Sequence, residues 1–262
     1  MPEERPAPEP VAAAGAAITQ GVLSYCEKPI ASRSRFVVAD KRCFDVRGHA
    51  GRCSDFPYLR HLKKVAKNVE EKIKRDATMT TGAAWLSDDA GFNRVQRWAM
   101  LLSDDEVQKV AGVDMTKLSP GVQRKLREKA ATYDDCIRVA QGLTWLAYGM
   151  ANAPKPPEEI RSYIETLFGP IVPGATTCVI CHAPLGFDLF KLARRGKAEI
   201  ESAHKNPRIH TPENVGFAHR FCNIAQGDMA LDEFYDWMET VLTRVGRSTR
   251  ARLLIRRPLH AA

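Results

Sequence analysis

Residues 178–228 decide the fold, and they read CVICHAPLGFDLFKLARRGKAEIESAHKNPRIHTPENVGFAHRFCNIAQGD. Two close pairs of possible metal ligands enclose this stretch, Cys178-x-x-Cys181 and His219-x-x-Cys222. Four nitrogen and sulfur ligands are what a tetrahedral structural zinc requires. A single cysteine pair would be weak evidence, because it can be redox-active or accidental, and Cys178 and Cys222 could also be separate buried thiols. The second pair favours a zinc site.

Two polar residues lie between the pairs, His204 and Asn214, and a third, Asn223, directly follows Cys222. This order resembles the HNH (ββα-metal) endonuclease family. Zinc-bearing members of that family read approximately CxxC, a strand ending in His with a Pro soon after, then Asn-Leu, then CxxCN. Here the corresponding stretches are ESAH with Pro207, then Asn-Val, then HRFCN, with His in place of the first Cys of the second pair. The resemblance covers residues 178–228.

The resemblance implies a role for each of the three residues. Hydrolysis of a phosphodiester needs a base for the attacking water and charge neutralisation at phosphorus. His204 would be the general base, since a neutral imidazole titrates near working pH. Asn223 would bind a catalytic Mg²⁺ or another divalent cation, and Asn214 would hold the connecting loop and orient the base. The zinc would be structural, and would fix a hairpin and helix so that His204 and Asn223 face each other across the phosphate.

The second ligand of the catalytic cation departs from the common pattern. Many family members carry Asp immediately before the base, where this chain has Ala203. Another branch carries a Glu-x-Ala-His version, which this sequence matches with Glu201. Glu201 is therefore the first candidate ligand, Asp228 the second and Glu199 a weaker one.

Two further histidines lie close to these motifs. His182 adjoins Cys181, but adjacent residues rarely both reach one zinc, so a surface position is expected. His210 lies in the loop near Asn214. It could contact phosphate there, but a histidine in such a loop is more often simply exposed.

A second group of possible zinc ligands lies near the N-terminus: Cys26, Cys43, His49 and Cys53. The surrounding segment has little apolar material with which to fold unaided, which favours a second zinc site. The alternative is a set of free thiols, with His61 as a substitute ligand. The chain has seven cysteines, and this odd number in close groups indicates metal binding in a reducing compartment rather than a disulfide framework.

The charge balance fits a nucleic-acid partner. The net charge is +8, which suits DNA without proving it. Arg33, Arg35 and Arg42 would decorate the N-terminal module as DNA-binding residues. Arg247 and Arg250 belong to an arginine-rich C-terminal stretch, for which a solvated tail and a phosphate-contacting arm are equally good interpretations.

The overall pattern predicts an α+β protein with a mainly helical N-terminal and middle region and a C-terminal zinc-bound ββα-metal module. Helical period appears in VAKNVEEKIKR, FNRVQRWAMLL, VQRKLREKAATYDDCIRVAQGLTWLAYGM and PPEEIRSYIETLF. Ser103 and Ser119-Pro120 are typical helix starts. The predicted segments are a disordered lead-in (1–17), a small basic module (18–62), a helical region (63–170), the nuclease domain (171–243) and a basic tail (244–262).

The last predicted helix is amphipathic. Its apolar residues should pack onto the nuclease core, and they are Leu231, Phe234, Tyr235, Met238 and Leu242.

No membrane association is expected, because no apolar run is long enough to span a bilayer. The first residues, MPEERPAPEP, carry acids and prolines where a secretory signal would carry basic and then apolar residues. These features favour a cytoplasmic protein.

Three functions fit the sequence. The first is a restriction-type DNA endonuclease, as free-standing HNH proteins of this size often are. The second is a structure-specific or phage-type HNH nuclease. The third is a catalytically inactive zinc-ribbon DNA-binding protein, which the missing acid before His204 keeps open. One HNH site cuts one strand, so a palindromic target would imply a homodimer.

Overall fold

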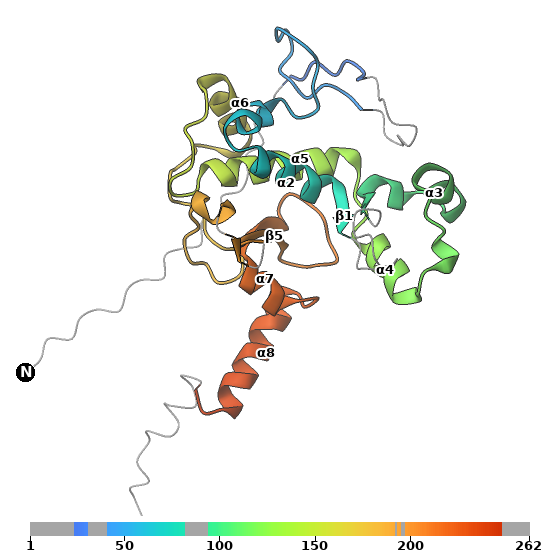
Figure 1. The fold of residues 1–262 in the computed structure, drawn as a ribbon, viewed down its shortest axis with the longest axis vertical. Helices are drawn as coiled ribbons and strands as arrows, with labels where there is room; N and C mark the ends of the chain where they lie inside the picture. The colour runs from blue at the N-terminus through green and yellow to red at the C-terminus, as the bar shows by residue number, and fades with distance from the viewer. Residues whose placement is uncertain (1–23, 31–40, 82–93, 192, 195–196, 248–262) are drawn as a thin grey trace, which may run out of the picture.

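The computed structural model describes residues 24–30, 41–81, 94–191, 193–194 and 197–247 (Figure 1). The fold is α+β, as predicted, with helices around small two-stranded antiparallel sheets. The described helices are α1 (Arg60–Val65), α2 (Lys67–Thr78), α3 (Asp104–Ala111), α4 (Pro120–Glu128), α5 (Tyr133–Tyr148), α6 (Glu158–Phe168), α7 (Arg220–Gln226) and α8 (Leu231–Arg244). The strands are β1 (Met79–Thr81) with β2 (Arg94–Gln96), β3 (Ala193–Arg194) with β4 (Lys197–Ala198), and β5 (Ile200–His204) with β6 (Val215–His219). Short 3₁₀ turns occupy Pro57–Leu59, Arg97–Leu101, Met115–Lys117 and Phe187–Phe190.

Helix α5 lies at the centre of the molecule. It packs against α2, α6 and β6, and Figure 1 shows it crossing the body behind α2 with the β5–β6 hairpin below. One hydrophobic core runs from Tyr58 to Phe234 and includes α2, α5, α6 and both strands of that hairpin. The predicted boundary between residues 170 and 171 therefore does not coincide with a break in the core.

Two predicted helix starts are confirmed. Helix α3 begins after Ser103, whose backbone N–H donates to the Glu106 carboxylate at 3.0 Å. Helix α4 begins at Pro120, which needs no N–H partner in the first turn.

Two predicted helical stretches are wrong in detail. Residues 94–96 form strand β2, and 97–101 form a 3₁₀ turn, because the backbone around Val95 pairs with β1 instead of closing a helix. The long stretch after Ser119 is broken at residues 129–132. Thr132 caps a new helix there by accepting a hydrogen bond from the N–H of Asp135 at 3.1 Å.

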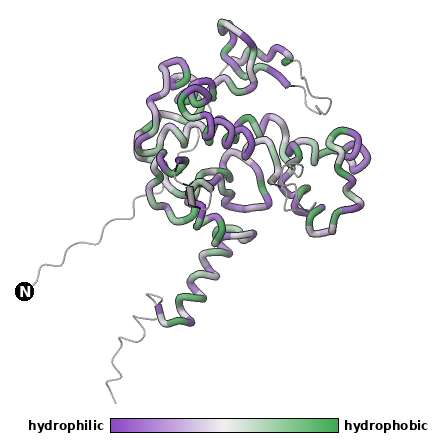
Figure 2. The backbone as a smooth tube through the Cα atoms, in the orientation of Figure 1, coloured by the Kyte–Doolittle hydropathy of each residue, from purple (hydrophilic) through white to green (hydrophobic). Residues whose placement is uncertain are grey.

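The packing of helix α8 differs from the prediction. Its first turns pack on the core through Phe234, with Leu231 and Tyr235 beside it. Beyond them the helix leaves the body of the molecule (Figure 1), and apolar residues recur along it (Figure 2). Met238 and Leu242, which were expected to be packed, are exposed because no described element covers that face. Within the described residues, no helix is both long and apolar enough to span a membrane.

Candidate metal centres and histidine site

The C-terminal group of predicted zinc ligands comes together in space. The ligand atoms of Cys178, Cys181, His219 and Cys222 all lie within 4.8 Å of one another. His219 Nδ1 lies 3.5 Å from Cys181 Sγ and 4.0 Å from Cys222 Sγ. Zn–S bonds of about 2.3 Å and Zn–N bonds of about 2.0 Å in a tetrahedron separate the ligand atoms by roughly 3.5–3.8 Å. The group could hold zinc.

The first cysteine pair forms a tight turn against the hairpin. The Cys181 N–H points at Cys178 Sγ (3.5 Å), and the His182 N–H donates to the Cys178 carbonyl (2.9 Å). His182 is exposed and lies outside the ligand group, as expected. The Val179 N–H donates to the Phe217 carbonyl at 2.9 Å, so the turn attaches to β6 through the backbone.

Gly216 makes this attachment possible. A Cβ at this position would lie 2.3 Å from Val179 Cγ1. Its cross-strand partner is Ala203, which is fully buried. A carboxylate at position 203 would lose its water in this packing, which gives a physical reason for Ala where the common pattern has Asp.

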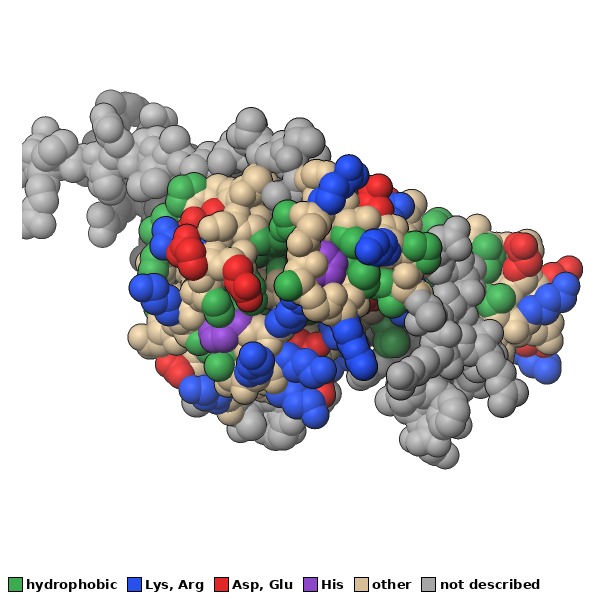
Figure 3. Space-filling model, turned by 90° about the horizontal axis from the view of Figure 1, so that it is seen from above, with side chains coloured by type: hydrophobic (Ala, Val, Ile, Leu, Met, Phe, Trp, Pro, Cys, Tyr) green, Lys and Arg blue, Asp and Glu red, His purple; other side chains and the backbone are tan. Residues whose placement is uncertain are grey.

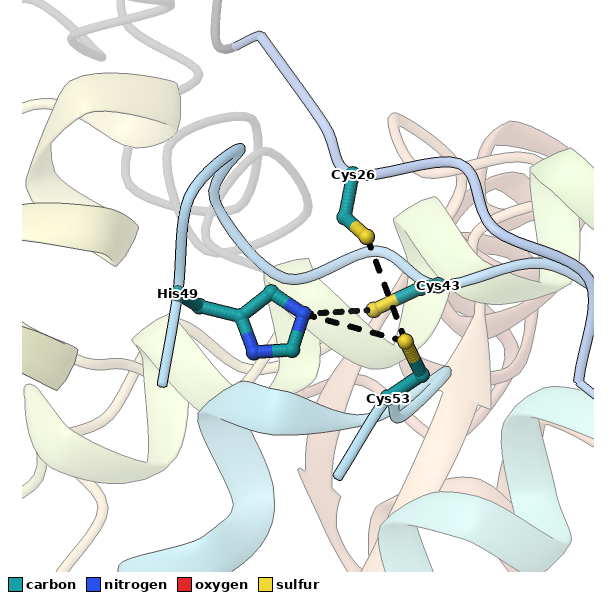
Figure 4. A group of neighbouring side chains, drawn as sticks. All are labelled: Cys26, Cys43, His49 and Cys53. Atoms are coloured by element: carbon teal, nitrogen blue, oxygen red, sulfur yellow. Dashed lines mark hydrogen bonds between the residues drawn. The ribbon is translucent and has the colours of Figure 1, made fainter. Parts of the chain in front are cut away.

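The N-terminal group also comes together (Figure 4). His49 Nε2 lies 3.4 Å from Cys43 Sγ and 3.9 Å from Cys53 Sγ, and Cys26 Sγ lies 3.9 Å from Cys53 Sγ. The other ring nitrogen, Nδ1, lies 3.3 Å from the Asp45 carboxylate. A carboxylate behind a histidine ligand is typical of zinc sites. This group too could hold zinc.

The substitute ligand considered for that group lies elsewhere. His61 Nδ1 lies 3.2 Å from the Tyr148 hydroxyl, and His61 is not part of the ligand group. Arg60 binds the Asp45 carboxylate at 2.6 Å, which links the N-terminal group to α1.

The β5–β6 hairpin runs directly into α7, giving the order strand, strand, helix. Ile200 pairs with His219 at one end and His204 with Val215 at the other. Asn223 on α7 donates through Nδ2 to the Glu201 carboxylate at 2.8 Å. Alternation along a strand puts Glu201 on the same face as position 203. Two of the predicted cation ligands therefore meet, whereas the same alternation puts His204 on the other face of β5, together with Ser202.

Asp228 has a different neighbour. Its carboxylate pairs with Lys125 of α4, and both side chains are substantially exposed. This ion pair, with Lys125 as the first cause, lowers the pKa of Asp228. The structure brings Glu201, and not Asp228, into hydrogen-bond contact with Asn223.

Asn214 closes the loop between β5 and β6. Its Oδ1 accepts from the Asn206 N–H, and its Nδ2 donates to the Asn206 carbonyl, each at 2.8 Å. Nδ2 also donates to the Ile209 carbonyl. The loop that carries His210 is thereby pinned at three backbone groups.

His210 is the residue that sequence reasoning misplaced. It was expected to be exposed, but it is only 3% exposed. Its Nδ1 lies 3.0 Å from His204 Nε2, and its Nε2 lies 2.9 Å from the Ala77 carbonyl at the end of α2. No local pattern marks this burial, because it depends on α2, which is distant in the sequence.

The surroundings of His204 and His210 favour the neutral form of both imidazole rings. Burial, followed by the positive charge of Arg97, lowers the pKa of His204 to about 3 and that of His210 to about 2. Lys129 contributes to the shift at His204. Arg97 is itself buried, and it donates to the backbone carbonyls of Asp76 and Lys129.

The predicted DNA-binding arginines are only partly described. Arg33, Arg35 and Arg250 lie outside the described residues. Arg42 pairs with Asp134 at 2.6 Å and lies over the ring of Phe44, while Arg247 is exposed. On the face shown in Figure 3, Lys and Arg side chains lie among Asp and Glu, with several gathered along one edge.

A family model described as DraIII matches residues 55–222, which is more than half of the chain. The chain belongs to the DraIII family. The DraIII match includes His204, His210 and Asn214, and it begins after the last ligand of the N-terminal group. Among solved structures, one described as a crystal structure of a type II restriction endonuclease is 45% identical, with a TM-score of 0.73. The alignment covers 85% of this chain and 99% of that one. No curated protein matches the chain.

Proposed function

We propose that this DraIII-family protein is a restriction-type DNA endonuclease that hydrolyses phosphodiester bonds at an HNH site. The contact between Asn223 and Glu201 carries the proposal. It places an amide and a carboxylate, both of which have oxygen atoms that can bind a metal, beside a group of possible zinc ligands. Membership of the DraIII family and the likeness to a type II restriction endonuclease support the same reading.

The residues fit a divalent cation. Asn223 and Glu201 would hold Mg²⁺ or a similar hard cation, for which oxygen donors are preferred. When bound, such a cation neutralises charge on the scissile phosphate. Arg220 lies 3.3 Å from the Glu201 carboxylate and helps to hold it in place.

His204 takes the proton of the attacking water in this proposal. Its low pKa keeps the imidazole neutral, which leaves a lone pair free for a proton but makes the ring a weaker base in the free protein than the sequence led us to expect. Arrival of a phosphate anion opposes the effect of Arg97 and Lys129, and so raises the pKa of His204 in the complex. Asn214 keeps the loop closed beside the base.

DNA is the partner in this proposal. Arg33, Arg35, Arg42, Arg247 and Arg250 remain the proposed phosphate contacts. Arg42 would have to exchange its ion pair with Asp134 for a phosphate.

A homodimer would place one cutting site on each strand. Helix α8 offers a surface for it: Trp237, Met238, Val241, Leu242 and Val245 form an exposed apolar stripe at helical spacing. Along α8 the acidic residues, at positions 232, 233, 236 and 239, precede the basic Arg244 at its end and Arg247 just beyond it. Two antiparallel copies would therefore bury the stripes and place acids opposite bases.

Plasmid cleavage tests the function. With Mg²⁺ or Mn²⁺, the wild-type protein should give discrete fragments. His204→Ala and Asn223→Ala should each reduce cleavage by about 100-fold or more, since each removes a catalytic group. Asn68→Ala is the matched control, because Asn68 is exposed on α2 and bonds only to the Phe190 carbonyl.

Other outcomes would favour the alternatives. Nonspecific degradation, or cutting of branched DNA alone, would indicate a structure-specific or phage-type nuclease. Binding of DNA by the wild-type protein without any cutting would contradict the proposal and favour an inactive DNA-binding protein.

A further inference from the structure

A chain of two hydrogen bonds joins the proposed base to the end of a distant helix. His204 Nε2 meets His210 Nδ1 at 3.0 Å, and His210 Nε2 meets the Ala77 carbonyl at 2.9 Å. The two rings are tilted at 46° to each other, with their centroids 5.2 Å apart, and are not stacked. Nothing in the HNH resemblance assigns a role to His210.

The second bond fixes where the protons lie. A carbonyl oxygen only accepts, so His210 Nε2 must carry the proton that it donates to Ala77. In a neutral imidazole the other nitrogen, Nδ1, then has only a lone pair. His204 Nε2 must donate to that lone pair, which leaves His204 Nδ1 as the unprotonated nitrogen. No described residue hydrogen-bonds to His204 Nδ1.

The alternative, in which His210 is doubly protonated, is disfavoured by its surroundings. His210 is buried, and Arg97 and His204 both oppose a positive charge on its ring. These effects hold the pKa of His210 far below neutrality. The neutral form, on which the proton assignment depends, therefore dominates at working pH.

Several contacts place His210 where it can act in this way. Asn214 pins the loop on both sides of residue 208. Alternate residues of β5 face α2: the Ser202 hydroxyl donates to the Asp76 carboxylate at 2.8 Å, while His204 reaches Ala77 through His210. The Asp76 carboxylate is itself paired with Lys72 and Arg75. The end of α2 thus forms a fixed support for this face of the strand.

We propose that His210 is a positioning residue that holds His204 in the tautomer protonated on Nε2, so that Nδ1 is the atom that takes the proton from the attacking water. The catalytic half of this statement rests on the proposed nuclease function. The tautomer does not, and it can be measured without DNA.

The first experiment is long-range ¹H–¹⁵N NMR of the histidine rings in the full-length protein. His204→Gln assigns the signals of that ring among the seven histidines of the chain. We expect a neutral His204 with its proton on Nε2 near pH 7. A His204 protonated on Nδ1, or a positively charged His210, would overturn the proposal whether or not the protein cuts DNA.

The second experiment compares two substitutions at the same position. His210→Leu removes both hydrogen bonds but keeps an apolar side chain. His210→Gln offers an acceptor and a donor separated by roughly the same distance as the two ring nitrogens, about 2.2 Å. We expect kcat to fall about 100-fold in the Leu variant, with KM little changed, and most of the loss to be recovered in the Gln variant.

The Leu variant should also show a mixture of His204 tautomers by NMR, and the Gln variant a single one. Leu and Gln variants with equally reduced kcat and the same His204 tautomer as wild type would contradict a positioning role. If the wild-type protein fails to cut any DNA, the proposed function fails, while the NMR result still decides the tautomer.

Discussion

The burial of His204 and His210 makes the stability of the folded protein depend on pH. Both rings are neutral in the folded state at pH values where an unfolded histidine, with a pKa near 6.5, begins to take up a proton. The lowered pKa values mean that the unfolded chain binds more protons in the window from about pH 6.5 down to about 3. The free energy of unfolding contributed by these rings therefore falls as the pH falls through this window.

We expect His210→Gln to weaken this dependence on pH. One histidine that titrates only when unfolded contributes up to about 1.4 kcal/mol per pH unit. Urea unfolding between pH 7 and 5 should show a shallower loss of stability in the variant than in the wild type. Release of the proposed zinc ions would affect both proteins alike, so the difference between the slopes is the relevant quantity. Parallel slopes would mean that His210 is protonated in the folded protein.

At the scale of elements, close sequence spacing was the most informative signal. Cys178-x-x-Cys181 and His219-x-x-Cys222 each lie within one turn or one strand–helix junction, so each pair comes together whatever the rest of the fold does. The helix starts at Ser103 and Pro120 were predicted for the same reason, since a cap involves only a few neighbouring residues.

Features that depend on distant partners could not be predicted. Strand β2 exists because it pairs with β1, and His210 is buried because its loop meets α2. The contact of Asn223 with Glu201 lies between these cases. Both residues were predicted from the sequence as cation ligands. Their contact depends on the register of the β5–β6 hairpin, which places Glu201 next to the start of α7.

We expect the protein to bind two zinc ions per chain. Cys26→Ala and Cys178→Ala should each lower the zinc content to one, because three ligands hold zinc more weakly than four. Cys136→Ala, at a buried cysteine outside both groups, should keep two. Metal content by elemental analysis of purified protein is the measurement. A wild-type protein with one zinc that survives in Cys26→Ala would show that the N-terminal group does not bind it.

At the scale of the whole molecule, most residues of α8 are exposed, more so than in the other helices of the described residues. Two residues of its apolar stripe show this: the side chain of Trp237 is 51% exposed and that of Val245 60%. A stripe of this kind on a helix that stands away from the body (Figure 1) is typical of an interaction surface.

Leu242→Asp should separate the proposed homodimer into single chains, because it places a charge within the apolar stripe. Thr243→Asp is the matched control, since it introduces the same charge at an exposed position on the face of α8 opposite the stripe. Analytical ultracentrifugation at micromolar protein should show a dimer for the wild type and for Thr243→Asp. A wild-type protein that sediments as a single chain would count against the dimer.

The core that runs from Tyr58 to Phe234 has a consequence for how such a protein could change during evolution. The apolar side chains of the hairpin that carries His204 pack in one core with those of α2 and α5, so the hairpin is not an independently folding unit. Grafted onto another scaffold, it would lose the surface against which it folds and the carbonyl that supports its histidine pair. Substitutions on the outer surface are therefore more easily tolerated than recombination of whole segments.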